Sequence, residues 1–228
     1  MEFVFAPPPV VSVSVAGSGA RFPVRRIFCI GRNYADHAKE MGATVDRGNP
    51  VFFCKPADAV VSGSGEICYP QATTELHHEV EMVVALHAGG MGISVDEALG
   101  CVFGYGVGLD LTRRDLQAAA KAKGMPWDTA KAFDHSAPIS AIHRVDDVGH
   151  PRQVELTLEV NEQTRQRSDI AQMVWSVPEI IASLSGLFEL KPGDLIFTGT
   201  PAGVGPLVRG DRFHACLHGI AQLDGCIA

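Results

Sequence analysis

The chain has 228 residues, 46% of them hydrophobic, and a formal net charge of −7. This length fits one large domain, and the apolar content excludes a disordered chain. The acidic charge speaks against a protein that binds the phosphate backbone of nucleic acids. Gly and Pro are abundant, with 24 and 14 residues, which is typical of a strand-rich fold with many turns.

The N-terminal segment has no charged residue between positions 3 and 20, and it contains three consecutive prolines at 7–9. The prolines exclude a membrane-spanning helix, and no basic region of a signal peptide precedes them. The six cysteines are scattered without a CxxC pair, as is typical of reduced thiols. We therefore expect a cytoplasmic protein outside the membrane, with an arm over residues 1–23 and one domain over 24–228.

Runs of alternating or continuous apolar residues predict most of the secondary structure. The predicted strands, in chain order, cover residues 11–15, 26–30, 51–54, 79–86, 101–111, 154–160, 164–167, 195–198 and 213–217. Helical spacing and end signals predict short helices over residues 33–41, 112–123 and 177–188. The second of these helices is expected to begin at Thr112, because Thr112 and Asp115 have the spacing of a capping box. The result is a β-rich α+β fold.

Three glycines occupy alternate positions of one predicted strand, at Gly104, Gly106 and Gly108. Side chains at alternate positions share one face of a strand. A face without side chains admits either another stretch of backbone or a ligand at close range. The sequence does not distinguish these two interpretations.

A pair of carboxylates, Glu79 and Glu81, lies on one face of a predicted strand whose other residues are apolar. Two buried anions side by side are costly without a cation between them. Asp110, which follows the glycine-spaced strand, can supply a third oxygen ligand. Three carboxylates suit Mg²⁺, Mn²⁺ or Ca²⁺ better than Zn²⁺, although a solvated strand face would also explain the pair.

Two histidines precede this pair, at His77 and His78. Because adjacent residues of a strand point to opposite faces, at most one of them can join the carboxylates. A structural role is the preferred interpretation for both.

His37 and Glu40 lie three residues apart on a predicted helix and so share one of its faces. A carboxylate beside an imidazole orients the ring and makes it a better general base. The following segment, residues 42–50, is rich in turn formers and predicts a hinged lid over residues 36–48. The alternative is a surface helix with mixed charges.

Three further features are candidates for contacts with an anionic substrate. Lys131 lies between Trp127 and Phe133 and can stabilise an oxyanion, and Arg114 can bind a carboxylate. The glycine-rich segment 198–205 offers backbone N–H groups and Thr200 to a carboxylate. Each is otherwise explained as a surface charge or as a turn.

Taken together, these motifs resemble those of the fumarylacetoacetate hydrolase family, in its acylpyruvase and fumarylpyruvate hydrolase branch. The resemblance covers residues 24–228. It is carried by segments 31–34 (GRNY), 36–37 (DH), 55–56 (KP), 77–81 (HHEVE), 108–112 (GLDLT), 114–115 (RD), 124–127 (GMPW), 130–131 (AK) and 199–205 (GTPAGVG).

The resemblance implies a mixed β-sandwich roll, a homodimer and a bound Mg²⁺ or Mn²⁺, with Ca²⁺ possible in crystals. It also implies a role for individual residues. The metal ligands would be Glu79, Glu81 and Asp110. The residues acting on the reaction would be His37, Glu40 and Lys131. The residues contacting the substrate would be Arg32, Asn33, Tyr34, Arg114, Gln117 and Thr200.

The implied reaction is the hydrolysis of a small 2-oxo acid, fumarylpyruvate, to fumarate and pyruvate in gentisate-type aromatic catabolism. One alternative is an oxaloacetate decarboxylase, or a related 2-oxo acid isomerase, of the same family. The other alternative is a protein without catalytic activity, in which the three carboxylates bind a structural Ca²⁺.

Overall fold

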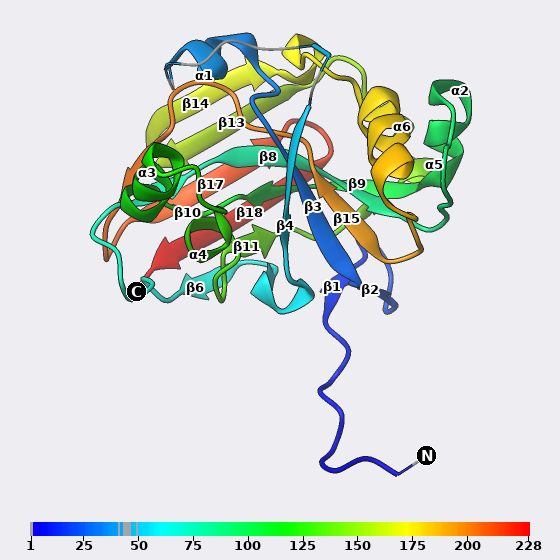
Figure 1. Ribbon diagram of the computed structural model, residues 1–228, viewed down its shortest axis with the longest axis horizontal. Helices are drawn as coiled ribbons and strands as arrows, with labels where there is room; N and C mark the ends of the chain where they lie inside the picture. Colours follow the sequence, from blue (N-terminus) through cyan, green and yellow to red (C-terminus); the bar gives the residue numbers. More distant parts are fainter. Residues whose placement is uncertain (1, 41, 43–46, 49) are drawn as a thin grey trace.

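The computed structural model describes residues 2–40, 42, 47–48 and 50–228. Strands dominate this part of the chain, and its helices are short (Figure 1). The predicted β-rich α+β fold is therefore confirmed.

The larger sheet of the described chain has eight strands in the order β4-β3-β15-β8-β9-β11-β5, with β12 paired to β9. Its strands are β3 (Arg26–Gly31), β4 (Val51–Lys55), β5 (Val60–Ser62), β8 (Val80–Leu86), β9 (Val102–Leu109), β11 (Ala137–Ile139), β12 (His143–Arg144) and β15 (Asp194–Phe197). Both faces of this sheet are buried. Successive residues of β8 alternate between two apolar clusters, since Met82 and Val84 pack in one cluster and Val83 and Ala85 in the other.

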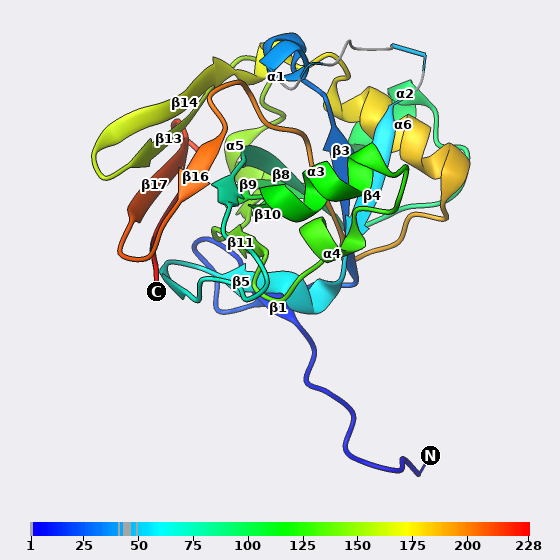
Figure 2. The same cartoon turned by 60° about the vertical axis from the view of Figure 1, so that its left-hand side comes forward.

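The second sheet has five strands in the order β14-β13-β17-β18-β6 and covers one face of the larger sheet (Figure 2). Its strands are β6 (Gly65–Ile67), β13 (Glu155–Val160), β14 (Gln163–Asp169), β17 (Arg212–Leu217) and β18 (Ala221–Ile227). Leu156, Leu158 and Phe213 point inward and join the same cluster as Met82. This arrangement is the sandwich-like roll that the resemblance implies.

Two small sheets complete the described strands, and one of them is close to the candidate site. They comprise β1 (Ser12–Ser14) with β2 (Arg21–Pro23), and β10 (Thr112–Arg113) with β7 (Leu76–His78) and β16 (Gly205–Leu207).

The described chain also contains short helices. They are α1 (Ala35–Glu40), α2 (Val95–Ala98), α3 (Arg114–Ala122), α4 (Asp128–Lys131), α5 (Val145–Val148), α6 (Val177–Leu187) and the 3₁₀ turns η1 (Ala57–Ala59), η2 (Leu99–Cys101) and η3 (Ile170–Gln172). Helix α6 packs residues Ile180, Ile181 and Leu184 into the same apolar cluster as Met82. Helix α6 begins with a capping box between Ser176 and Glu179. None of the described helices is long and apolar enough to cross a membrane.

The predicted start of the second helix is wrong. Thr112 belongs to strand β10 and donates its hydroxyl hydrogen bond to the Asp110 carbonyl. Asp115 instead accepts hydrogen bonds from the Thr73 hydroxyl (2.6 Å) and the Thr74 N–H (3.1 Å). Helix α3 therefore begins at Arg114. The Asp115 side chain binds the loop at Thr73 and Thr74 and does not form a capping box with Thr112.

The glycine-spaced strand is explained by packing between backbones. A methyl group at Gly104 would lie 2.1 Å from the His143 carbonyl oxygen, and one at Gly108 would lie 2.8 Å from that of Pro138. Strands β11 and β12 therefore pair with β9 at a distance that side chains would prevent. Of the two interpretations of this strand, the structure supports the close approach of a backbone.

Two predictions, the lid over residues 36–48 and the domain boundary at residue 24, are not tested by the structure. Most of the segment between α1 and β4, including residues 41, 43–46 and 49, lies outside the described residues, and so does the end of the helix predicted over 33–41. The boundary between an arm over 1–23 and a domain over 24–228 stays a prediction.

Candidate active site

Three buried carboxylates meet where β8 begins and β9 ends. The register of these strands pairs Glu81 with Gly108, and the Asp110 N–H donates to the Glu79 carbonyl (2.8 Å). Asp110 therefore stands beside the two glutamates, on the same side of the sheet. Glu79 is 5% exposed, Glu81 2% and Asp110 1%, which excludes the solvated strand face.

Three buried cations surround this group. Lys131, from α4, lies 2.8 Å from Glu79 Oε2 and 2.7 Å from Asp110 Oδ2. Arg114, at the start of α3, contacts Glu79 Oε1 at 2.5 Å and the Gln117 side-chain oxygen at 2.6 Å. The two predicted cations, Lys131 and Arg114, are thus both part of the site.

The third cation is Lys55, a site residue for which the sequence patterns predicted no role. Its Nζ lies 2.8 Å from Asp110 Oδ1 and donates to the backbone carbonyls of Leu111 (3.1 Å) and Lys131. A local feature of the sequence could have identified Lys55 as a buried cation. Lys55 ends an apolar strand, on the same face as Val51 and Phe53, and a charge in that position needs a partner inside the protein.

The pKa values of these groups reflect both burial and neighbouring charges. Burial raises the pKa of the Glu81 carboxyl, and the nearby Asp110 and Glu79 carboxylates raise it further. Burial also opposes ionisation of Glu79, but Lys131 and Arg114 outweigh it and hold the Glu79 pKa well below its usual range. Burial alone would lower the pKa of Lys131, yet Asp110 and Glu79 raise it, so the ammonium group stays charged.

The carboxylates have the composition and spacing of a site for a hard divalent cation. One oxygen of each lies within 4.8 Å of the others, and this is the only such group of potential ligands in the described chain. Among the described residues, Glu81 receives one hydrogen bond, from the Gly199 N–H (2.7 Å), and forms no ion pair. A buried carboxyl group without an ion-pair partner and the all-oxygen ligand set fit Mg²⁺ or Mn²⁺.

The predicted pair on helix α1 is formed. His37 Nδ1 lies 3.3 Å from Glu40 Oε2, and both carboxylate oxygens of Glu40 accept from the Gly203 N–H at 3.2 Å. His37 is buried, and its ring faces the same cavity as the three carboxylates. The mixed-charge surface helix is therefore excluded for the inner face of α1.

The glycine-rich segment 198–205 binds carboxylates, but those it binds belong to the protein. Gly199 holds Glu81 and Gly203 holds Glu40. Thr200 is fixed by the Gln166 amide (2.8 Å), and the same Gln166 accepts at 3.0 Å from His78 through the ring atom Nδ1.

Both histidines of the 77–78 pair have structural contacts. His78 is buried against Gln166, and burial lowers its pKa. His77 contacts Arg114 (3.4 Å), and burial followed by the Arg114 charge lowers its pKa to about 4. Neither side chain belongs to the group of potential metal ligands among the described residues, which agrees with the preferred interpretation.

A small cavity of about 40 Å³ joins these groups. The predicted residues that line it are Arg32, His37, Glu79, Glu81, Asp110, Arg114, Gln117, Lys131 and Thr200. Arg32 reaches it from a left-handed backbone conformation (φ 61°), which an arginine adopts at a cost in energy. The volume is close to that of one water molecule, so it has room for an ion but not for a whole substrate.

Two predicted substrate contacts lie outside this cavity. The Asn33 side chain donates to the carbonyls of Trp175 (3.0 Å) and Thr198 (2.8 Å) and accepts from the Trp175 N–H (2.7 Å). The Tyr34 hydroxyl is buried without a hydrogen-bond partner in the described chain. Asn33 therefore holds the loop together, and substrate contacts by Asn33 and Tyr34 stay predictions.

A second hollow, of about 420 Å³, adjoins the small cavity. The two share Phe53, Trp127 and Lys131. The Phe53 and Trp127 rings meet edge to face with centroids 5.9 Å apart, and Lys131 Nζ lies 5.1 Å from the Phe53 centroid. This aromatic pair stands where the charged cavity opens into a more apolar space.

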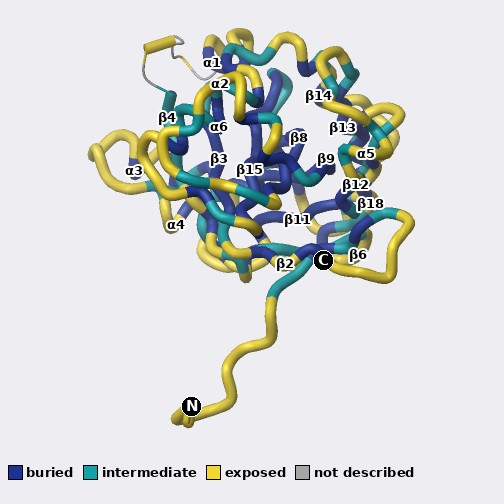
Figure 3. The backbone as a smooth tube through the Cα atoms, turned by 90° about the vertical axis from the view of Figure 1, so that its right-hand side faces the viewer, coloured by how far each residue is buried: buried dark blue, intermediate teal, exposed yellow. Residues whose placement is uncertain are grey.

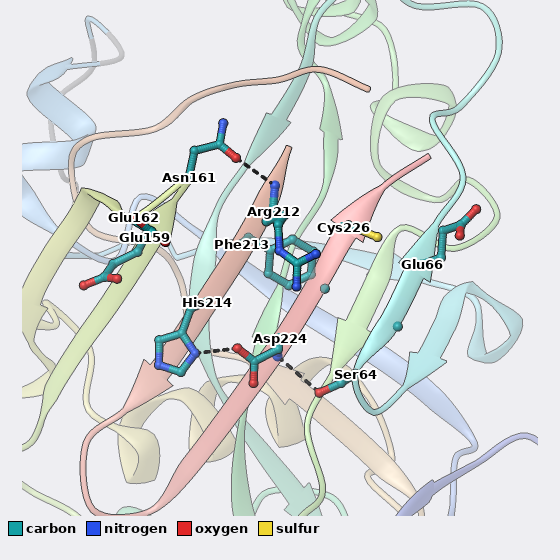
Figure 4. A pocket seen from close by; sticks show the side chains of 12 residues that line it. Ser64, Glu66, Glu159, Asn161, Glu162, Arg212, Phe213, His214, Asp224 and Cys226 are labelled. Atoms are coloured by element: carbon teal, nitrogen blue, oxygen red, sulfur yellow. Dashed lines mark hydrogen bonds and ion pairs between the residues drawn. The ribbon is translucent and has the colours of Figure 1, made fainter. Parts of the chain in front are cut away.

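A larger hollow, of about 790 Å³, lies elsewhere, on the outer face of the five-stranded sheet (Figure 4). His214 and Asp224 form an ion pair there at 2.8 Å, and Glu159 and Arg212 flank them. It contains none of the predicted site residues.

Comparisons with known proteins agree with this geometry. The model of the family described as fumarylacetoacetate hydrolase, C-terminal, matches residues 26–228. A crystal structure of fumarylpyruvate hydrolase from Pseudomonas aeruginosa, in complex with Mn²⁺ and pyruvate, is 48% identical and superposes with a TM-score of 0.98. That superposition covers 100% of this chain and 99% of the other.

Two curated relatives are named as oxaloacetate tautomerases and not as hydrolases. Oxaloacetate tautomerases of Mus musculus, a mitochondrial protein, and of Escherichia coli K12 are each 41% identical over 199 residues. Both alignments cover 87% of this chain and 90% of the relative. Hydrolases and tautomerases thus share this fold, and the choice between their reactions rests on the residues of the site.

Proposed function

The chain belongs to the fumarylacetoacetate hydrolase family, and from that premise we propose that it hydrolyses the carbon–carbon bond of an acylpyruvate. The proposed substrate is fumarylpyruvate, and the products are fumarate and pyruvate. The proposed metal is Mg²⁺ or Mn²⁺. A cytoplasmic homodimer, a role in aromatic catabolism and a catalytic domain that begins at residue 24 are part of the same proposal.

The observation that carries the proposal is the His37–Glu40 pair beside the three carboxylates. Since Glu40 occupies Nδ1 of His37, the ring presents Nε2 to the cavity as the atom that accepts a proton. Glu40 is itself held by the Gly203 N–H, so the ring has a fixed orientation. A histidine oriented in this way can activate water, which a hydrolase requires and a tautomerase does not.

The charge balance of the site favours a substrate with two carboxylates. The carboxylates of Glu79, Glu81 and Asp110 are matched by three cations, Lys55, Lys131 and Arg114. A divalent cation therefore adds charge that the protein leaves uncompensated, and the side chains of two more cations, Arg32 and Lys121, also line the cavity. Fumarylpyruvate is a dianion, whereas acetylpyruvate carries one charge.

The reaction follows from the positions of the side chains. A cation held by Glu79, Glu81 and Asp110 would supply Lewis-acid stabilisation of negative charge on the substrate oxygens. His37 takes a proton from water, and the hydroxide adds to the acyl carbonyl carbon. Lys131, kept charged by its neighbours, stabilises the oxyanion. The carbon–carbon bond then breaks, fumarate leaves, and the pyruvate enolate takes up a proton to give pyruvate.

The adjoining hollow of about 420 Å³ is the space into which the acyl chain of the substrate is proposed to extend. The small cavity has room for little more than the ion, so the rest of the substrate extends past Phe53 and Trp127 into the space beyond them. Oxaloacetate has no acyl group beyond its 2-oxo acid portion to extend into that space, whereas fumarylpyruvate has one.

The second candidate is oxaloacetate tautomerisation, which the 41% identity to two tautomerases favours. Proton transfer between enol and keto forms needs a base and charge stabilisation but no attacking water. Oxaloacetate decarboxylation has the same requirements for charge stabilisation. The remaining alternative, a structural Ca²⁺ site, does not explain why the His37–Glu40 pair faces the same cavity.

One experiment separates these functions. The purified protein with Mg²⁺ is given fumarylpyruvate, acetylpyruvate and oxaloacetate side by side, and the products are identified by chromatography. We expect fumarate and pyruvate, with a kcat/KM for fumarylpyruvate at least about tenfold above that for acetylpyruvate, because one charged contact is worth about 1.5–3 kcal/mol. Conversion of oxaloacetate without release of fumarate from fumarylpyruvate would contradict the proposal.

A further inference from the structure

One buried glutamine, Gln166, contacts the candidate site without lining its cavity. It belongs to β14, an edge strand of the five-stranded sheet, and its neighbours among residues 163–167 are all exposed (Figure 3). Gln166 itself is 1% exposed and pairs in register with Leu158, a member of the apolar cluster that contains Met82. Burial of an amide is costly unless its hydrogen bonds are made inside the protein. This side chain therefore depends on internal partners.

The Gln166 side chain uses its whole capacity for hydrogen bonds. Its carbonyl oxygen accepts from the His78 ring and from the Val80 N–H, both at 3.0 Å. Its NH₂ group donates to the Thr200 hydroxyl and to the Pro201 carbonyl, both at 2.8 Å. Two contacts at each end fix the orientation of the amide, and they fix the partners relative to one another.

The two ends of Gln166 hold different parts of the site. The carbonyl end binds the backbone at Val80, between the two glutamates of the carboxylate group. The NH₂ end binds the residues that directly follow Gly199, whose N–H donates to Glu81 at 2.7 Å. Gln166 thus supports both the strand that carries Glu81 and the loop that holds its carboxylate.

The same loop continues to Gly203, whose N–H donates to the Glu40 carboxylate at 3.2 Å. A methyl group at Gly203 would lie 2.1 Å from the Arg165 carbonyl oxygen. The loop therefore lies directly against the backbone of β14, beside Gln166, at a distance that a side chain would prevent. Strand β14 in this way supports the N–H group that holds Glu40 and, through Glu40, the His37 ring.

We propose that Gln166 is a positioning residue, which fixes the His37–Glu40 pair relative to the three carboxylates. The carboxylates belong to the buried sheet, whereas α1 is attached to it through the loop 199–203. Gln166 binds both the start of β8 and this loop. A misplacement of about 1 Å can cost about a hundredfold in rate, so such a connection matters for a general base. The inference rests on the proposed hydrolysis and extends it to a residue outside the cavity.

A purely structural role is the alternative, because four lost hydrogen bonds also destabilise the fold. The two roles differ in their dependence on His37. If Gln166 acts by orienting the base, its removal should cost little once the base itself is gone. A structural defect lowers the amount of folded enzyme, so it should reduce turnover by the same factor with or without His37.

The test is a double-mutant cycle on kcat for fumarylpyruvate with Mg²⁺, in which circular dichroism gives the amount of folded protein. Gln166→Met keeps the length of the side chain and removes its amide. We expect kcat to fall about 10–100-fold in the wild-type background, as for other groups that orient a site residue, and less than about threefold in the His37→Ala background. Gln163→Met, at an exposed glutamine of the same strand, is the matched control and should leave kcat unchanged.

A second variant assigns the effect to one end of the amide. Gln166→Glu keeps acceptors for His78 and Val80 but cannot donate to the Pro201 carbonyl. It should lower kcat as Gln166→Met does, again only when His37 is present, and it carries the test if Gln166→Met does not fold. Equal losses with and without His37, or wild-type kcat in either folded variant, would overturn the inference. Release of fumarate by the wild type is measured first, since its absence would refute the proposed function itself.

Discussion

The carboxylate group and the His37–Glu40 pair share one cavity but are supported in different ways. Glu79, Glu81 and Asp110 belong to neighbouring strands of a sheet that is buried on both faces, and each carboxylate is almost fully buried. Helix α1 has six residues and lies at the edge of the fold, and the side chain of Glu40 is 37% exposed. One region is built into the core, and the other is attached to it through Gly203.

This difference suggests that the carboxylate group and the His37–Glu40 pair contribute to different steps of the reaction. The carboxylates and their cations hold and polarise a 2-oxo acid, which hydrolases, tautomerases and decarboxylases all require. The pair on α1 adds the base that activates water, which only the hydrolase requires. Substitutions in the sheet should therefore abolish every reaction of the site, whereas substitutions on α1 should change which reaction it performs.

The largest effect is expected at Glu81, which has the weakest support of the three carboxylates. Glu81→Gln keeps an oxygen for the Gly199 N–H but removes the charge that binds the cation. Since loss of a group behind a metal ligand costs about 10–100-fold in affinity, we expect loss of the ligand itself to weaken Mn²⁺ binding at least 100-fold in calorimetry and to abolish all turnover. Circular dichroism should show an intact fold. Full activity of the wild type in excess EDTA would refute the metal site.

The next effect separates the two regions directly. His37→Ala should reduce acylpyruvate cleavage by about 10²–10⁴-fold, which is what a positioned general base contributes. Mn²⁺ affinity should stay near that of the wild type, and any decarboxylation of oxaloacetate, which needs charge stabilisation but no base, should fall much less. Asp36→Asn, at an exposed residue of the same helix, is the control. If cleavage survives in His37→Ala within a few-fold, His37 is not the base and the proposed mechanism is wrong.

A third prediction concerns Lys55, which joins the carboxylate group to α4. Lys55→Met removes the cation beside Asp110 and two hydrogen bonds to backbone carbonyls. Breaking a buried ion pair on one side costs about 3–5 kcal/mol, so we expect a clear loss of stability in urea denaturation. Added Mn²⁺ should restore part of it, because the ion replaces the lost charge. Arg21→Met, at a cation of the β1–β2 sheet outside the site, should show no such dependence on Mn²⁺.

Sequence patterns predicted the types of residue in the site better than the long-range contacts between them. The strands and the three carboxylates follow from alternation and spacing, which are local. The role of Lys55 was missed because its partners, Asp110 and the Lys131 carbonyl, are far away in the sequence. The start of α3 was misplaced for the same reason, since Asp115 binds the loop at Thr73. Segment 198–205 was predicted to offer N–H groups to a substrate carboxylate, whereas the fold brings Glu81 to the Gly199 N–H and Glu40 to the Gly203 N–H.

The smallest effect is expected at Trp127, between the charged cavity and the adjoining hollow. Trp127→Ala removes the edge-to-face contact with Phe53 and the surface that the acyl chain is proposed to cross. An aromatic contact is worth about 0.5–1.5 kcal/mol, so KM for fumarylpyruvate should rise about two- to tenfold with kcat little changed. KM for acetylpyruvate and inhibition by oxalate should hardly change, because both ligands end before the aromatic pair. Met125→Ala, at an exposed neighbour (56% exposed), is the control. An equal rise in KM for both acylpyruvates would place the acyl chain elsewhere while leaving the roles of His37 and the carboxylates intact.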